Sequence, residues 1–255
     1  MRFFLELQYK GTKYRGWQRQ SKVFSVQEEV ENALSKIFKR KVTTHCCGRT
    51  DAGVHASQFF AHCYLEEKPS FNLSERLNYI LPKDVRIIRT FPVRKMNAQL
   101  SALSRTYVYK IHGDDNPFLA DLSTLYPIED LDFSLLEQAA AMVKNGVDFK
   151  AFCKRPDLMN HTRCRIDQSF WTQFPEQNSI CYTVQGDRFL RGMVRLLVGT
   201  MLEVGIGNMA LEKFEDHLIN QTKLSEYKAA FPQGLYLAGV SYPEGFDKLE
   251  EIKSS

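Results

Sequence analysis

The chain has 255 residues, of which 25% are charged, and a formal net charge of +4. A chain of this length forms one large or two small domains whose core needs neither disulfides nor metal, and its mild positive charge permits nucleic-acid binding without requiring it. The six cysteines lack the spacing of a disulfide framework, and no apolar run is long enough for a membrane span or a signal peptide. We therefore expect a cytoplasmic protein with reduced thiols and no membrane partner.

The N-terminal segment is predicted to be a strand followed by a basic loop. Residues 2–9 alternate between apolar and polar side chains, as a strand with one buried face does. Residues 10–20 interleave lysines and arginines, Lys10 among them, with Tyr14 and Trp17. This mixture neutralises phosphates and offers flat faces to bases, which is typical of an RNA-facing loop. The alternative is a glycine-rich surface loop with Trp17 in the core.

A helix is predicted after this loop. Residues 25–28, Ser-Val-Gln-Glu, form a capping box, and apolar residues then recur at helical spacing as far as Phe38. The end of the helix is basic, with Lys36, Lys39, Arg40 and Lys41. A helix dipole favours cations at this end, so the cluster is only weak evidence for RNA binding.

Residues 48–56, Gly-Arg-Thr-Asp-Ala-Gly-Val-His-Ala, separate two β-like apolar runs at 41–47 and 57–65. A loop between two strands can hold a carboxylate on a rigid support, so Asp51 is the candidate reacting group. The alternative is an ordinary hairpin turn in which glycine supplies the positive φ. A turn needs neither Arg49 beside the acid nor His55 after it, and strand pairing does not ask for Thr50.

The rest of the first half is predicted as a strand at 57–65, a helix at 73–81 that ends before Pro82, and a strand at 85–91. This order indicates an α+β half with a largely antiparallel sheet. No Gly/Ser-rich linker follows, so we expect a first half, residues 1–104, packed against a second, residues 105–255.

The second half begins with a predicted strand at 104–111, which places Arg105, Tyr107 and Tyr109 on one face. Two tyrosines on one sheet face most often indicate core packing. Residues 121–133 are predicted as loop, 134–144 as a helix, and 149–152, 164–171 and 180–185 as strands. The segment 153–163 is basic and poor in apolar residues; it is either a mobile loop that closes on RNA or a solvated loop.

A helix is predicted at 189–204, where Arg188, Arg191 and Arg195 share a stripe with Gly192 and Gly199. Arginines in the first turns oppose the helix dipole, so something anionic should compensate them. We infer that the partners are Asp51 and RNA phosphates, with Arg195 deepest.

Residues 48–56 are similar to the signature of the tRNA pseudouridine synthase A family. The resemblance extends to segments over nearly the whole chain: Gly11-Thr12 with Gly16-Trp17-Gln18, Arg105-x-Tyr107-x-Tyr109, residues 189–195, and residues 234–237. It implies an α+β fold of two similar halves, each a mostly antiparallel sheet with helices on one face, packed around a central basic cleft.

The resemblance also implies the reaction and the roles of its residues. Asp51 would be the nucleophile that isomerises uridine to pseudouridine, Arg195 its ion-pair partner, and Tyr107 and Leu235 the side chains against the uracil. Arg49 could stack in the space of an everted base. The further residues expected to contact RNA are Lys10, Trp17, His55, Arg105, Arg188 and Arg191. The implied substrate is the anticodon arm of tRNA at uridines 38, 39 and 40, the implied enzyme is a homodimer, and no cofactor is expected.

Two departures and two rival functions accompany this interpretation. The family commonly has His-Ala-Arg-Phe where this chain has Asn97-Ala98-Gln99-Leu100, and its Ala-Pro segment appears here as residues 230–233. The lost arginine could change which uridines are modified. The first rival is a non-catalytic tRNA-binding protein. The second is a metal-dependent hydrolase built on His45, Cys47 and His62, which the opposite orientation of consecutive strand residues and the lack of a metal-binding motif disfavour, so no metal is expected.

Overall fold

The computed structural model describes residues 1–224 and 228–247, and these form two compact units. One unit comprises Met1–Leu103 together with the described residues from Leu237 onward, and the other comprises Ser104–Tyr236. Both units combine helices with a mostly antiparallel sheet, which confirms the predicted α+β class. Among the described residues, no helix is long and apolar enough to cross a membrane.

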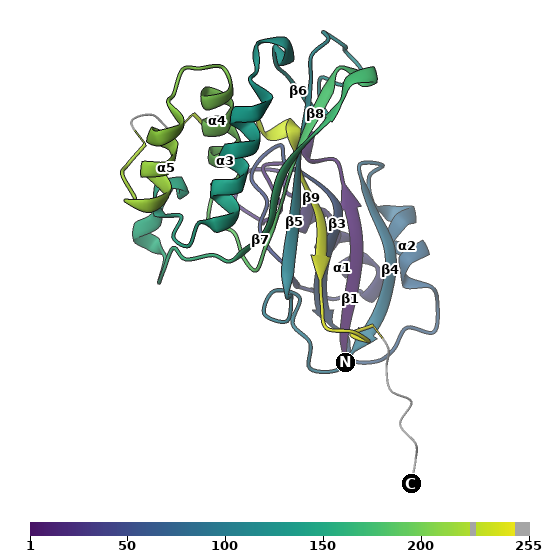
Figure 1. Cartoon of the computed structure of the whole chain (residues 1–255). Coiled ribbons are helices and arrows are strands. Elements are labelled where there is room, and N and C mark those ends of the chain that lie inside the picture. The colour runs from purple at the N-terminus through teal and green to yellow at the C-terminus, as the bar shows by residue number, and fades with distance from the viewer. Residues whose placement is uncertain (225–227, 248–255) are drawn as a thin grey trace. The chain divides into compact units, whose positions relative to one another are not determined.

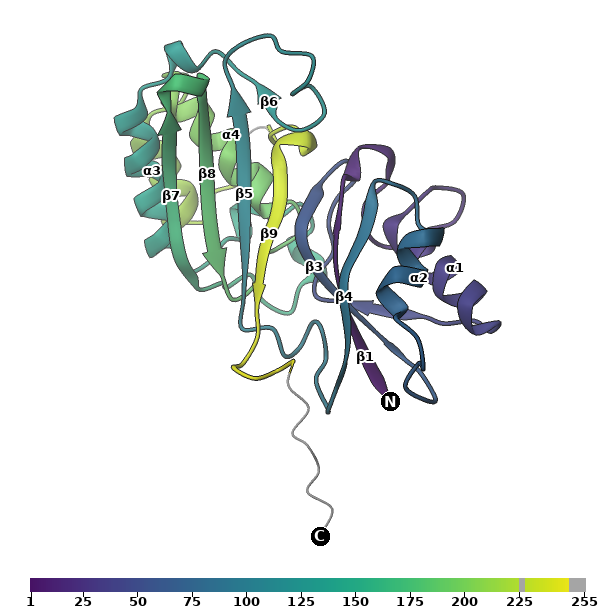
Figure 2. The same cartoon turned by 90° about the vertical axis from the view of Figure 1, so that its right-hand side faces the viewer.

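The first unit is built on strands in the order β4-β1-β3-β9. β1 (Arg2–Tyr9) lies antiparallel between β3 (His55–Tyr64) and β4 (Val85–Val93), and the short β2 (Thr44–Cys46) also pairs with β3. β9 (Leu235–Ser241) begins in the second unit and ends in the first. Helices α1 (Val26–Phe38) and α2 (Leu73–Ile80) lie together on one side of these strands (Figure 2).

Local capping explains where these helices start. The Ser25 side chain accepts a hydrogen bond from the Glu28 backbone N–H at 3.3 Å, which confirms the capping box read from the sequence. Asn72 makes the equivalent bond to the Glu75 N–H at the start of α2. Phe4 packs against Phe60 and Phe91, so β1 contributes an apolar side chain to an aromatic cluster of the core.

The second unit has strands in the order β5-β8-β7, all antiparallel. These are β5 (Ser104–His112), β8 (Ser179–Gly186) and β7 (Ile166–Phe174), and the two-residue β6 (Thr124–Leu125) runs parallel to β5. Helices α3 (Phe133–Asn145), α4 (Met193–Gly205) and α5 (Leu211–Ile219) lie on one side of the strands (Figure 1). α4 is buried along most of its length, as expected of a helix that is apolar almost all round.

The prediction of a helix that begins at residue 189 is wrong. α4 begins at Met193. Its N-cap, Gly192, has φ +73, a left-handed conformation that interrupts a right-handed helix, so residues 189–191 lie outside α4. Arg188 and Arg191 therefore lie in the connection before the helix, and the predicted arginine stripe does not exist. Arg195 alone of the three arginines lies in the first turn of α4.

Two other element predictions need correction. The strand predicted at 149–152 is instead a 3₁₀ turn, Lys150–Phe152, in which Ala151 and Phe152 are buried. The strand predicted at 57–65 starts two residues earlier, at His55, so part of the signature loop belongs to β3. Short apolar runs do not distinguish a strand from a buried turn.

His62 on β3 is a buried histidine that the fold keeps neutral. Its Nδ1 accepts a hydrogen bond from the Ala98 N–H at 3.2 Å, and its ring is 1% exposed. Burial lowers the pKa of His62 to about 4, and the positive charges of Arg2 and His45 act in the same direction. In the unfolded chain, His62 binds a proton near the ordinary histidine pKa of 6.5. The neutral, buried ring therefore contributes fully to the stability above that pH, and this contribution is lost as the pH falls towards 4.

We predict that the stability of the protein falls between about pH 6.5 and pH 4 in part because of His62. A pKa difference of this size corresponds to at most about 3 kcal/mol. His62→Asn keeps an acceptor for the Ala98 N–H but does not titrate, so its free energy of unfolding should fall less over this range. Chemical denaturation of both proteins at several pH values measures this, and parallel pH profiles would contradict the assignment.

Candidate active site

The turn that carries Asp51 is held by backbone hydrogen bonds on both sides of the carboxylate. The Trp17 N–H donates to the Thr50 carbonyl at 3.3 Å, and the Gly53 N–H donates to the Tyr14 carbonyl at 3.1 Å. Within the turn, the Val54 N–H donates to the Asp51 carbonyl at 3.2 Å. The residues before and after Asp51 are thus tethered to the segment that follows β1.

A glycine allows the two segments to approach at backbone distance. Gly16 has φ +91, and a Cβ at this position would lie 2.3 Å from the Thr50 carbonyl oxygen. No side chain fits at that distance, and L-residues rarely adopt that φ. Gly16, the glycine of the Gly-Trp-Gln segment, therefore allows the Asp51 turn to lie against the segment that follows β1.

Trp17 does not face RNA, and that prediction is wrong. Its side chain is fully buried, with its ring centroid 4.2 Å from that of Phe59 and 6.2 Å from that of Tyr9. The alternative that places Trp17 in the core is the correct one, because the apolar area of an indole is better buried than left in a loop. Lys10 and Arg49, by contrast, are exposed.

His55 is buried at the start of β3 and has a structural contact. Its Nδ1 accepts a hydrogen bond from the Gly11 N–H at 3.0 Å, which joins the first residues of β3 to the loop after β1. That acceptor requires Nδ1 to be unprotonated, so the ring is bound in one orientation. Contact of His55 with RNA stays a prediction.

In the second unit, Tyr107 lies on β5 and is nearly buried, with 9% exposure. Its ring meets the Phe189 ring edge to face, with centroids 5.0 Å apart. On the same strand, the Arg105 guanidinium donates to the Asp187 carbonyl at 2.8 Å. Leu235 is buried at the start of β9.

The three arginines differ in how they are held. Arg195 Nε donates to the Ala230 carbonyl at 2.7 Å, and the Ala230 N–H donates back to the Arg195 carbonyl at 2.9 Å, so this side chain is fixed. Arg188 makes a 3.0 Å hydrogen bond with His161 Nε2 of the basic loop. Arg191 is exposed, and its carbonyl accepts from the Lys154 N–H at 3.1 Å.

The structure therefore brings the predicted residues together in two groups. The first unit holds Asp51, His55 and the other expected residues of that half, namely Lys10, Trp17 and Arg49. The second unit holds Arg105, Tyr107, Arg188, Arg191, Arg195 and Leu235. Sequence reasoning missed Tyr9, whose hydroxyl lies 2.8 Å from the Thr50 hydroxyl, because a tyrosine at the end of a strand resembles any core aromatic.

The histidines and cysteines considered as metal ligands make other contacts in the structure. His45 stacks on His62 with ring centroids 5.1 Å apart, and Cys47 Sγ accepts from the Phe60 N–H at 3.4 Å. Within residues 1–224 and 228–247, no group of three or more His, Cys, Asp or Glu side chains is arranged to hold a metal ion. These residues serve packing and strand pairing.

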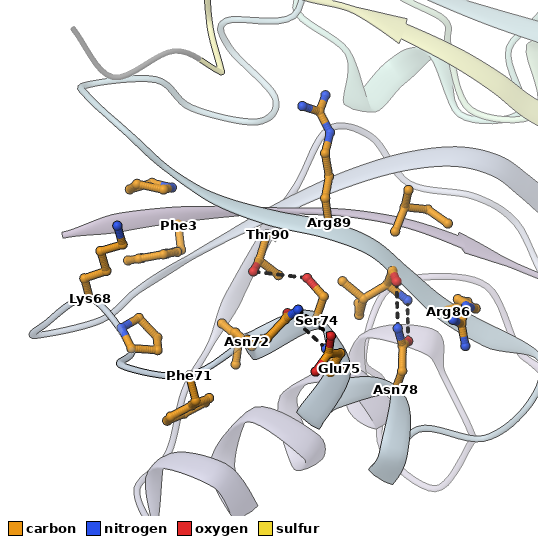
Figure 3. Close-up of a pocket in the computed structure, with 15 residues that line it drawn as sticks. Phe3, Lys68, Phe71, Asn72, Ser74, Glu75, Asn78, Arg86, Arg89 and Thr90 are labelled. Carbon is orange, nitrogen blue, oxygen red and sulfur yellow. Dashed lines mark hydrogen bonds between the residues drawn. The ribbon is translucent and has the colours of Figure 1, made fainter. Parts of the chain in front are cut away.

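A groove of about 660 Å³ lies in the first unit between α2 and β4, away from the Asp51 turn in sequence (Figure 3). Some of its polar groups bind one another or the backbone. Asn78 contacts both backbone groups of Ile87 at 2.8 Å, and Ser74 donates to Thr90 at 3.3 Å. We place the candidate site at the Asp51 turn instead, because that turn carries the signature residues.

Comparison with known proteins gives matches over nearly the whole chain. A family model described as tRNA pseudouridine synthase matches residues 146–243. The chain is 39% identical over 246 residues to tRNA pseudouridine synthase A of Porphyromonas gingivalis, an alignment that covers 95% of this chain and 97% of the relative. It is 35% identical to the protein of the same name from Parabacteroides distasonis (98% and 99% covered) and 36% identical to that of Bacteroides thetaiotaomicron (99% and 95% covered).

We predict that Gly16→Ala destabilises the protein by at least about 2 kcal/mol, because the new Cβ meets a carbonyl oxygen and the positive φ becomes strained. Gly48→Ala is the matched control on the Asp51 turn itself, since a Cβ there meets nothing within 4 Å. Its free energy of unfolding should stay within about 0.5 kcal/mol of the wild type. Equal stability of the two variants, measured by chemical denaturation, would show that the close approach is not needed.

Proposed function

Because the chain belongs to the tRNA pseudouridine synthase A family and is therefore a tRNA-modifying isomerase, we propose that it acts on the anticodon arm of tRNA, at uridines 38, 39 and 40, with Asp51 as its nucleophile. The observation that carries this proposal is the Gly48–Ala56 signature, whose aspartate stands on a turn tethered on both sides. The anticodon arm comes from the family resemblance.

The reaction breaks the bond between the ribose and uracil N1 and rejoins the base through C5. The atoms and the redox state of the nucleoside do not change, so the chemistry calls for no electron carrier. A base within a stem must first leave its stack, and single-stranded or everted bases are read by stacking on flat side chains. The exposed Arg49, two residues before Asp51, has a planar guanidinium suited to fill the vacated space.

Asp51 must be ionised to act as a nucleophile, and the anion adds either to the base or to the ribose. Desolvation opposes ionisation in a partly dry site, whereas a neighbouring guanidinium favours it. We propose that Arg195 supplies this charge. Its side chain is held by the Ala230 carbonyl, so it is ordered before substrate arrives, which is the arrangement that electrostatic stabilisation requires.

Tyr107 is proposed to hold the freed uracil by stacking and to help remove the C5 proton, with Leu235 packed beneath the base. Its ring is fixed edge-on by Phe189, which supports a positioning surface rather than a mobile side chain. The basic side chains of Lys10, Arg188 and Arg191 are proposed to bind phosphates, together with His55 and Arg105 near the base. The segment 153–163 is proposed to belong to the same phosphate-binding surface, because its His161 contacts Arg188.

The proposed assembly is a homodimer in the cytoplasm whose subunits together cradle one tRNA. One protomer with a net charge of +4 offers limited basic surface for a large polyanion, so sharing the ligand between two copies is favourable.

We predict that Asp51→Asn and Asp51→Ala abolish pseudouridine formation but keep tRNA binding, because both remove the nucleophile and leave the phosphate contacts. Release of tritium from uracil C5 measures the reaction, and a filter-binding titration measures affinity. The control is Asp115→Asn, which changes an exposed carboxylate of a loop in the second unit and should behave like the wild type. Turnover by Asp51→Asn would refute the mechanism, and the absence of turnover in the wild type would favour a tRNA-binding protein without catalysis.

We predict that Arg191→Ala weakens tRNA binding and lowers the slope of log affinity against log salt by about 1, because one phosphate contact is lost. Chemistry in a single turnover at saturating enzyme should change little. Arg76→Ala is the matched control, since this exposed arginine covers the Phe71 ring at 3.9 Å and has no proposed RNA contact. Equal salt slopes for the two variants would show that Arg191 does not face RNA.

A further inference from the structure

Two hydroxyl groups meet in the interior of the first unit, one of them on the residue before the candidate nucleophile. The Tyr9 hydroxyl at the end of β1 lies 2.8 Å from the Thr50 hydroxyl, and Thr50 is the residue before Asp51. Both side chains are buried, with exposures of 4% and 8%. A turn between two strands has no need of a buried hydrogen bond to its tip, so this pair calls for an explanation.

The Tyr9 ring is itself rigidly placed. Its centroid lies 5.5 Å from that of Phe59 in an edge-to-face contact, and Trp17 packs beside it. Tyr9 is also opposite Ala56 in the pairing of β1 with β3, so its backbone is fixed by the sheet. A hydrogen bond from this side chain therefore fixes Thr50, and with it the Asp51 turn, relative to the sheet.

Thr50 is held at both its side chain and its backbone. While its hydroxyl contacts Tyr9, its carbonyl accepts the Trp17 N–H at 3.3 Å, with Gly16 packed against the same oxygen. These contacts come from different directions and leave the residue little freedom. The Cα of Asp51 follows directly, at the fixed distance that a trans peptide imposes.

We propose that Tyr9 and Thr50 are positioning residues, whose hydroxyl pair sets where the Asp51 carboxylate stands relative to the target uridine. This inference rests on the proposed role of Asp51 as nucleophile. Reacting atoms must come within about 3–3.5 Å of each other, and a misplacement of about 1 Å costs on the order of 100-fold in rate. A contact one residue from the nucleophile is well placed to control such a distance.

The test compares variants that lose or keep the hydroxyl pair. Tyr9→Phe removes one hydroxyl and Thr50→Val removes the other with little change of shape, while Thr50→Ser keeps it. We expect the first two to lower the single-turnover rate by about 10-fold to 100-fold with a KM for tRNA within about 3-fold of the wild type, and Thr50→Ser to retain most of the rate. The double variant Tyr9→Phe/Thr50→Val should be no slower than the slower single variant, because the two groups act through one contact.

Tyr182→Phe is the matched control. Tyr182 also forms a buried hydroxyl pair, with Ser169 at 2.8 Å, but on β8 and β7 of the second unit, whereas the Asp51 turn belongs to the first. This variant should lower the midpoint of unfolding as Tyr9→Phe does and should leave the rate unchanged. The comparison separates loss of positioning from loss of stability.

The outcomes decide between the hypotheses. If Tyr9→Phe and Thr50→Val react within 2-fold of the wild type, or if they raise KM at an unchanged rate, the hydroxyl pair does not position the nucleophile. A slow Thr50→Ser, or rate losses that multiply in the double variant, would also overturn the inference. The proposed function fails separately: in that case the wild type is inactive or Asp51→Asn turns over.

Discussion

A carboxylate on a four-residue turn has no fixed position unless something other than the turn holds it. In this protein that support is the packing of the segment after β1 against the turn that carries Asp51. The Trp17 N–H binds the carbonyl on one side of the acid, and the Tyr14 carbonyl binds the Gly53 N–H on the other. The two segments can approach closely enough for these bonds because Gly16 has no side chain to keep the backbones apart. The position of Asp51 therefore depends on the segment around Tyr14 and Trp17, earlier in the chain, and that segment is anchored by Trp17 in the core.

The aromatic residues of the loop at 10–20 have a different role from the one that the composition of this loop suggests. A loop with lysines, arginines and two aromatic residues looks like a nucleic-acid surface, yet Trp17 is fully buried and Tyr14 donates its hydroxyl to Asp84 at 2.6 Å. The aromatic residues hold the loop, and its cations such as Lys10 are left exposed. Support of the Asp51 turn and surface charge thus come from different residues of one short segment.

Local sequence signals predicted the elements with strong boundaries and failed where conformation depends on a single backbone angle. The capping box at Ser25 and the strand at residues 2–9 were predicted correctly, although Phe4, on the face expected to be exposed, is fully buried. The start of α4 was misplaced, because the apolar spacing continues through Phe189 and Leu190 although Gly192 adopts a left-handed φ. Glycine in a helical pattern indicates a possible break, but only the three-dimensional structure shows whether the break is used.

The candidate site shows the same limit of sequence reasoning. A signature motif makes Asp51 the candidate reacting group, because its residue types exceed what a turn requires. The hydroxyl pair of Tyr9 and Thr50 was beyond reach of sequence reasoning, since it joins residues 41 positions apart and each alone looks like core or turn. Motifs identify groups that react, whereas the groups that position them are found by their contacts.

The departure at residues 97–100 can be understood in the same physical terms. Ala98, which this chain shares with the family pattern, is buried and holds the segment: its N–H donates to His62 Nδ1, and its carbonyl accepts the Tyr242 hydroxyl at 2.6 Å. Asn97 Oδ1 accepts two backbone N–H groups, at 2.9 Å from Gln99 and 3.0 Å from Leu100, so the asparagine stabilises the turn locally. Gln99 and Leu100 themselves are exposed. The chain therefore keeps the buried contact that fixes the segment and differs from the family pattern at exposed side chains, so the fold of the segment does not depend on the missing arginine.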